Sequence, residues 1–226
     1  MAKRLPGSSE KIVDEIAALE TRLQPLLSRG NDEALAETDY YCTLVTATIK
    51  NRQRLDSQLN RQSMTVLMEK IDYCTLRTLE LYSGMRIEGG SGTINFYIRS
   101  TQLTKQHLLV CLMAVYSLQQ LLEQLSKQSG IDLEIAWTLC SDNLAASPLI
   151  QHHEGLDRLK AQAAVLAQEL DEGTIAMQSR EYDIEQLTSI AHFLPFSEDC
   201  YLLQGFPEGR QMLLEKQVQH LASICF

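Results

Sequence analysis

The chain has 226 residues, which is enough for one domain or two small ones. Its composition is 45% hydrophobic and 22% charged, with 11 glycines and 5 prolines, which excludes a disordered, collagen-like or low-complexity protein. The net charge is -9, and residues 1–84 hold 11 of the 20 basic residues but only 12 of the 29 acidic ones. Because the acidic remainder repels phosphate, we expect no nucleic-acid binding except through the first half.

No segment has the pattern of a membrane anchor or a secretory signal. The longest uninterrupted apolar run, Leu108 to Tyr116, has nine residues, whereas a membrane-spanning helix needs roughly 20. The basic N-terminus has no apolar stretch behind it. The six cysteines form no C-x-x-C pair and lie mostly among apolar residues, which favours reduced, buried thiols over disulfides. We therefore predict a cytoplasmic protein that contacts no membrane.

Residues 1–83 have the pattern of helices that need a partner. Over residues 10–29, apolar residues recur at heptad spacing, which predicts a narrow stripe that faces another helix. The members of this stripe are Ile12, Ile16, Leu19, Leu23 and Leu26. Residues 33–83 contain no Pro or Gly, which predicts a long helix folded back on the first, with a break near residues 61–63. The whole segment is thus predicted to be a helical hairpin or coiled-coil arm.

The middle of that long segment is basic and has few apolar anchors. Its aliphatic residues are Leu55 and Leu59, and its basic residues include Lys50, Arg52, Arg54 and Arg61. Such a stretch is typical of a solvated helix face. It also fits a docking surface for an acidic partner or for the acidic half of the same chain. In the docking hypothesis the two leucines extend the apolar contact row, and the arginines at 52, 54 and 61 are its charge partners.

Residues 84–226 alternate between strand and helix patterns. Two β-rich runs, Met85–Glu88 and Thr93–Ile98, flank a glycine-rich turn and predict a β-hairpin. A helix is predicted over Gln102–Gln128, and period-two alternation over residues 131–139 predicts a strand with Trp137 on its dry face.

Four further elements are predicted beyond that strand. They are an amphipathic helix around 156–170, a short strand at 174–177, a helix from Ser179 to Leu194, and a last helix over 207–224. We therefore predict an α+β fold that is predominantly α: the arm over 1–83, and a compact domain over 84–226 with a small antiparallel or mixed sheet packed on helices.

Few residues carry a chemical signature. The turn Gly89–Gly92 could bind phosphate through backbone N–H groups, but no Lys-Ser/Thr follows it, which favours a plain hairpin. Adjacent histidines such as His152 and His153 chelate a metal poorly, because they point about 100° apart on a helix. Cys140 could pair with either histidine as a thiol–imidazole couple, although no nucleophile motif surrounds it. We predict no catalytic residue, metal or cofactor.

Strong helix patterning without site chemistry favours an interaction role. The main hypothesis is a non-catalytic cytoplasmic assembly or adaptor protein, which binds another protein or a second copy of itself through helices. The alternative is a small-ligand-binding or enzymatic α+β domain with its site near Cys140, His152 and His153. Nucleic-acid binding through residues 50–61 is a third and weaker hypothesis.

Overall fold

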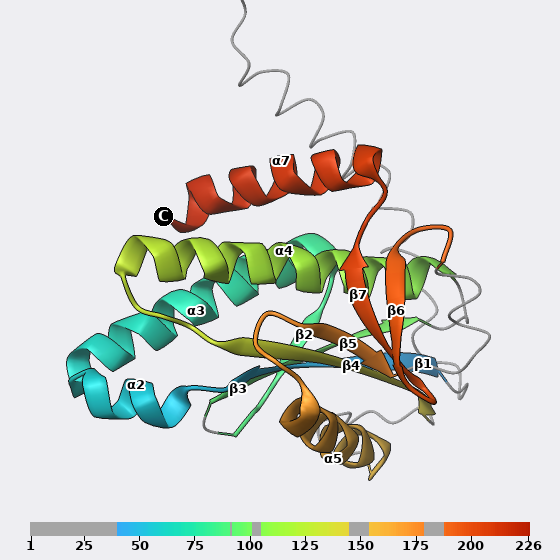
Figure 1. The fold of residues 1–226 in the computed structure, drawn as a ribbon, viewed down its shortest axis with the longest axis horizontal. Coiled ribbons are helices and arrows are strands. Elements are labelled where there is room, and N and C mark those ends of the chain that lie inside the picture. The colour runs from blue at the N-terminus through green and yellow to red at the C-terminus, as the bar shows by residue number, and fades with distance from the viewer. Residues whose placement is uncertain (1–39, 91, 101–104, 145–153, 179–187) are drawn as a thin grey trace, which may run out of the picture.

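The computed structural model describes residues 40–90, 92–100, 105–144, 154–178 and 188–226. These residues form a seven-stranded sheet with helices on both faces (Figure 1). The strands are β1 (Tyr40–Ile49), β2 (Met85–Ile87), β3 (Thr93–Ser100), β4 (Ile135–Leu144), β5 (Ile175–Gln178), β6 (His192–Ser197) and β7 (Cys200–Gly205). The helices are α2 (Arg52–Gln58), α3 (Arg61–Tyr82), α4 (Lys105–Ser129), α5 (Glu154–Glu169) and α7 (Glu208–Cys225).

The sheet is mixed, and its strand order is β2-β3-β1-β4-β5-β7-β6. Only β4 and β5 run parallel; the other neighbours are antiparallel. Strand β1 lies inside the sheet, where it pairs with β3 on one side and β4 on the other. The first strand in the described chain therefore joins the hairpin to the rest of the sheet.

The prediction of a helical arm over 1–83 is wrong for the part that the structure describes. Residues 40–49 form β1, and α2 and α3 follow it as two separate helices. Half of the ten residues of β1 are β-branched, and two more are tyrosines, so the segment fits a pleated surface better than a helix. Absence of Pro and Gly was therefore a weak indication of helix. The heptad stripe over 10–29 lies outside the described residues.

Different helices cover the two faces of the sheet. Successive side chains along each strand point to opposite faces and so pack against different helices. Odd-numbered residues of β1 such as Val45 and Ala47 face α3 and α4 and belong to the main core. Even-numbered residues such as Cys42 and Leu44 pack instead against Leu156 of α5. Figure 1 shows α5 alone on one side of the sheet and α3, α4 and α7 on the other. The α5 face is thus the less heavily covered one among the described elements.

Helix α4 is the centre of the thicker layer. Its 22-residue stretch Leu108–Ser129 is long and apolar enough to cross a membrane, but 67% of an apolar 18-residue segment within it is buried inside the domain. Helices α3 and α7 both pack against it. The three helices meet at a buried polar contact, in which the Tyr82 hydroxyl donates to Gln217 Oε1 at 2.8 Å and lies 3.0 Å from Ser117 Oγ. This contact fixes how the three helices stack.

Several elements of the second region follow the sequence patterns. The hairpin β2–β3 is confirmed, and so is Trp137 as a fully buried residue of β4. Strand β4 begins at Ile135 rather than at residue 131, because residues 131–134 connect α4 to the sheet. The helix predicted to end at Leu194 is wrong at its C-terminal end, where residues 192–197 form the edge strand β6.

Candidate functional site

The predicted contact row does not form one surface in the described chain. Ile12, Ile16, Leu19 and Leu23 lie outside the described residues. Leu55 is 2% exposed in the main core, and Leu59 is half-buried against that core. Leu55 is therefore used by the interior of this same chain and is not available to another molecule, whereas Leu59 is only partly covered.

The predicted charge partners Arg52, Arg54 and Arg61 have different surroundings. Arg52 Nε pairs with Asp56 at 3.1 Å within α2. Arg54 pairs with Asp132 and Glu134, both at 2.6 Å. Arg61 is exposed at the start of α3. The sequence allowed two acidic partners for these arginines, another protein or the acidic half of the same chain. For Arg54 the partner is the same chain, through Asp132 and Glu134.

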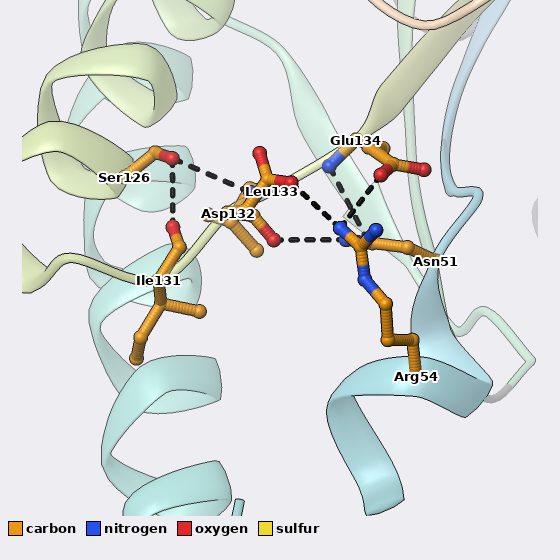
Figure 2. A network of polar contacts seen from close by, with 7 residues as sticks. All are labelled: Asn51, Arg54, Ser126, Ile131, Asp132, Leu133 and Glu134. Carbon is orange, nitrogen blue, oxygen red and sulfur yellow. Dashed lines mark hydrogen bonds and ion pairs between the residues drawn. The ribbon is translucent and has the colours of Figure 1, made fainter. Parts of the chain in front are cut away.

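Figure 2 shows how this region ties the end of β1 to the connection between α4 and β4. Asn51 Nδ2 donates to the Asp132 carbonyl at 2.8 Å, and Asn51 Oδ1 accepts from the Glu134 N–H at 3.3 Å. Ser126 Oγ donates to the Ile131 carbonyl at 2.7 Å on the α4 side of the same connection. Asn51 is buried and both of its side-chain polar atoms have partners within the chain, so this network is a structural support.

The site predicted around Cys140 has no chemical activation. Burial raises the pKa of the Cys140 thiol to about 12, and its Sγ contacts Gln178 Oε1 at 3.7 Å. The thiolate is the nucleophilic form, so this thiol is inert at neutral pH. His152 and His153 lie outside the described residues.

A different group of side chains stands out on the α5 face of the sheet. Cross-strand pairing places Thr46 opposite Asn95 and Thr48 opposite Thr93, so these four residues form two adjacent rows on β1 and β3. We call them the polar strip. Thr46 is 5% exposed and Asn95 is 7% exposed, while Thr48 and Thr93 are half-buried. The strip therefore runs from a partly open end into the interior.

The buried end of the polar strip contains two oxygens without a partner in the described chain. These atoms are Thr46 Oγ1 and Asn95 Oδ1, each shielded from solvent. Thr138, opposite Thr46 on β4, donates instead to the Thr46 backbone carbonyl at 3.4 Å. An unpaired buried polar group costs roughly 1–3 kcal/mol, so two of them on directly opposed residues call for an explanation.

The open end of the polar strip meets the glycine turn between β2 and β3. Thr93 N–H and Thr93 Oγ1 both donate to the Gly90 carbonyl, at 3.1 and 3.0 Å. A Cβ on Gly89 would lie 2.8 Å from the Thr93 carbonyl oxygen and 3.2 Å from Asn95 Nδ2. Glycine at 89 thus lets the turn close directly over the side chains of β3.

A basic residue at the end of β1 holds α5 over this face. Lys50 Nζ donates to the Ala167 carbonyl at 2.7 Å and to the Gln168 carbonyl at 3.5 Å. These carbonyls are at the C-terminal end of α5, where the helix dipole is negative and a cation is stabilising. The Lys50 ammonium group therefore stabilises the C-terminal end of α5.

The architecture described above is that of nucleotide cyclase domains. No protein-family model matches the sequence, and no curated protein matches it in a sequence comparison. Among solved structures, it is similar to the adenylyl cyclase CyaB from P. aeruginosa, with a TM-score of 0.61 and 13% identity over 77% of this chain and 98% of that chain.

Two guanylyl cyclase domains are similar to the same extent. The dimeric domain of the RhoGC fusion protein from the aquatic fungus Blastocladiella emersonii has a TM-score of 0.62 and 15% identity over 74% of this chain and 97% of that chain. The RhGC domain from Catenaria anguillulae, solved in complex with GTP, has a TM-score of 0.60 and 11% identity over 74% of this chain and 97% of that one. At these identities the likeness establishes the fold.

This finding corrects the functional hypothesis drawn from the sequence. The chain was predicted to be a non-catalytic adaptor or scaffold acting through a coiled coil, and that prediction is wrong, because its described part has the fold of nucleotide cyclase domains. The alternative hypothesis, a small-ligand-binding or enzymatic α+β domain, fits the fold better. Cys140 is not among the described residues with an unpaired buried polar side-chain atom, which are Thr46, Asp72, Asn95, Gln119, Trp137 and Gln217.

The residues of the polar strip do not fit a divalent cation. Magnesium in nucleotide sites is held by carboxylates together with the phosphates of the substrate. The strip offers hydroxyls and an amide, and Glu88 is the one carboxylate in the turn beside it. No group of three or more Asp, Glu, His or Cys side chains suited to a metal is found among the described residues. The four residues of the strip therefore offer no carboxylate to such an ion.

Proposed function

We propose that this chain is a nucleotide-binding domain with the cyclase fold, and that the ligand binds on the α5 face of the sheet at the polar strip. The observation that supports this proposal is the pair of unpaired, buried oxygens Thr46 Oγ1 and Asn95 Oδ1, the two of six such side-chain atoms in the described chain that belong to directly opposed residues. They lie on neighbouring strands, at directly opposed positions, beside a glycine turn. A ligand that supplied hydrogen-bond partners would remove the cost of leaving both atoms unpaired.

The chemistry of the strip agrees with a nucleoside. Ribose hydroxyls and the polar edge of a purine both donate and accept hydrogen bonds, as do the hydroxyls and amide of the strip. The similar domain from Catenaria anguillulae was solved in complex with GTP, which supports a purine nucleotide as the ligand class. The similarity covers 98% of the CyaB chain and 97% of the RhGC chain, so it extends over nearly all of both solved chains.

Isothermal titration calorimetry with the full chain tests this proposal. GTP, ATP and their cyclic monophosphates would each be titrated, in buffer with magnesium and in buffer with excess EDTA. We expect saturable binding of at least one purine nucleotide, and loss of that binding in Thr46→Val. Absence of heat with all four ligands in both buffers would overturn the proposal. A parallel assay for pyrophosphate release from the triphosphates shows whether the bound nucleotide is also turned over.

We also propose that the domain associates with a second copy of itself. The RhoGC guanylyl cyclase domain was solved as a dimer, which supports the self-association part of the partner prediction, although the same domain was also solved as a monomer. Light scattering coupled to size-exclusion chromatography at increasing protein concentration tests it. A mass that stays monomeric across the range would argue against it. Contact through helices and a cytoplasmic location stay predictions.

A further inference from the structure

Two cysteines from different helices lie against each other in the helical layer on the side of the sheet away from α5. Cys74 of α3 is 1% exposed and belongs to the main core. Cys225, in the last turn of α7, is half-buried and packs against that core. The two thiols are hydrogen-bonded to each other. The function proposed above uses neither of them.

The packing of α3 against α7 holds this pair in place. The two helices run in opposite directions (Figure 1), and the Tyr82 hydroxyl joins them by donating to Gln217 Oε1 at 2.8 Å. Cys74 is eight residues before Tyr82, and Cys225 is eight residues after Gln217. Eight helical residues span about 12 Å, so both cysteines lie at the same level along the two helices. The contact that fixes the helices therefore also fixes the distance between the thiols.

The other four cysteines lack an accessible partner of this kind. Cys42, Cys111, Cys140 and Cys200 are all buried, so the fold shields them from a dissolved oxidant. Cys140 and Cys200 are on strands separated by β5, with Gln178 opposite each of them. Two strand spacings are roughly 9–10 Å, which is too far for a disulfide.

We propose that Cys74 and Cys225 form a reversible disulfide that links α3 to α7 when the chain reacts with a small-molecule disulfide such as oxidised glutathione. This inference is independent of the nucleotide-binding function proposed above. The Cys225 thiolate attacks one sulfur of oxidised glutathione, the S–S bond breaks, and one glutathione leaves and takes up the proton that Cys225 has lost. Cys74 then attacks the Cys225 sulfur of the mixed disulfide, and the second glutathione leaves with the Cys74 proton. Two protein thiols are thus oxidised by two electrons, and oxidised glutathione is reduced to two thiols.

Exposure and charge assign a different role to each cysteine. Burial raises the pKa of the Cys225 thiol, whereas the hydrogen bond from Cys74 and the positive charge of Arg77 both lower it. Cys225 is also the more exposed of the two, so it is the thiol that meets the oxidant. Burial raises the pKa of the Cys74 thiol to about 12, which leaves little thiolate at neutral pH. Its step is intramolecular, however, and proximity offsets that small fraction.

The disulfide should stabilise the fold. A covalent link between residues far apart in the sequence removes conformational freedom from the unfolded chain. The folded chain gives up little in return, because the two thiols are already in contact. We therefore expect the oxidised chain to melt about 5–10 °C above the reduced chain.

Thiol trapping followed by mass spectrometry of the full chain tests this inference. The reduced chain would be equilibrated in glutathione buffers with an increasing oxidised fraction, quenched with acid, and alkylated. We expect the loss of two alkylation sites without a bound glutathione, and a cross-linked peptide that contains Cys74 and Cys225. Dithiothreitol should reverse both changes and the rise in melting temperature.

Three variants separate the steps of the exchange. Cys225→Ser should form no disulfide and should melt at the same temperature with and without oxidised glutathione. Cys74→Ala should stop at the mixed disulfide and carry one glutathione on Cys225. Cys200→Ala is the matched control, because it also removes a buried cysteine, and it should form the disulfide to the same extent as the unmodified chain.

Four outcomes would overturn the inference. One is that no disulfide forms in the most oxidising buffer, and another is a cross-link between other cysteines. The third is a glutathione adduct that stays on Cys225 in the unmodified chain, which would show that Cys74 cannot reach it. The fourth is a disulfide that forms without raising the melting temperature, which would show that it strains the packing of α7.

Discussion

The buried contact between α3, α4 and α7 gives the sharpest test of the packing described here. The Tyr82 hydroxyl donates to Gln217 Oε1 at 2.8 Å and lies 3.0 Å from Ser117 Oγ. All three residues are at most 1% exposed, so water cannot replace a lost partner. Gln217 Nε2 already has no partner in the described chain. The two ends of the contact should therefore respond unequally to substitution.

Tyr82→Phe removes the one hydroxyl that satisfies Gln217. The amide would then be buried with neither of its polar atoms paired, which costs about 1–3 kcal/mol. Gln217→Leu is milder, because Tyr82 keeps Ser117 as a partner and the unsatisfied Nε2 disappears. We expect it to cost about 0–1 kcal/mol. In a domain of this size, each kcal/mol lowers the melting temperature by about 2–4 °C.

A double-mutant cycle measured by urea unfolding checks this reasoning. With Leu at 217, the Phe substitution at 82 leaves no unsatisfied amide, so the double variant should be more stable than the sum of the single effects by about 1 kcal/mol. Ser117→Ala serves as a control, because Tyr82 and Gln217 still satisfy each other in that variant. Additive effects, or a larger loss in Gln217→Leu than in Tyr82→Phe, would show that the contact is wrongly described.

Four further outcomes follow from the structure. Burial raises the pKa of the Cys74 and Cys140 thiols from 9.0 to about 12. As pH rises, the unfolded chain therefore loses these thiol protons before the folded chain does. The contribution of the two thiols to the free energy of unfolding should be complete below about pH 9 and should fall as pH rises towards 12. Urea titrations at several pH values would detect this fall. Lys50→Met should cost about 0.3–1 kcal/mol by freeing the carbonyls at the end of α5, whereas Lys70→Met on exposed α3 should be neutral in the same thermal melts. Gly89→Ala should destabilise the hairpin by about 1–3 kcal/mol, because its Cβ would lie 2.8 Å from a backbone oxygen, while Gly90→Ala meets nothing closer than 3.8 Å and should be tolerated. Leu55→Ala should cost about 2–5 kcal/mol, since this side chain is 2% exposed, and Leu213→Ala, at 36% exposed, should change the unfolding free energy far less.

The sequence predicts best the elements whose pattern has one physical explanation. Gly-rich residues between two β-rich runs have few uses other than a hairpin, and β2 and β3 form one. The segment around Leu112 is apolar on all sides, which only a buried helix explains, and α4 is that helix. Trp137 shares its parity with the apolar residues of β4, and it is fully buried.

The prediction fails where one pattern fits two structures. Residues 40–49 lack Pro and Gly, as a helix would, yet their β-branched residues favour a strand, and pairing with β3 and β4 decides between the two. Residues near Leu194 have helical spacing, but Pro195 lies in the edge strand β6, where a missing N–H is tolerated. In both cases the deciding contacts come from segments far away in the sequence.

The candidate site shows the same limit in a stronger form. Threonine on a central strand is an ordinary residue, because its branched side chain favours the pleated backbone. Nothing in the local sequence therefore distinguishes Thr46, whose hydroxyl has no partner, from Thr43, whose hydroxyl has one. The difference arises from the face of the sheet that each residue occupies and from Asn95 on the neighbouring strand. Clustered carboxylates or histidines can be recognised from their spacing in the sequence. A site made of neutral polar groups can be recognised only in the folded chain, where the hydrogen-bond partner of each group can be checked.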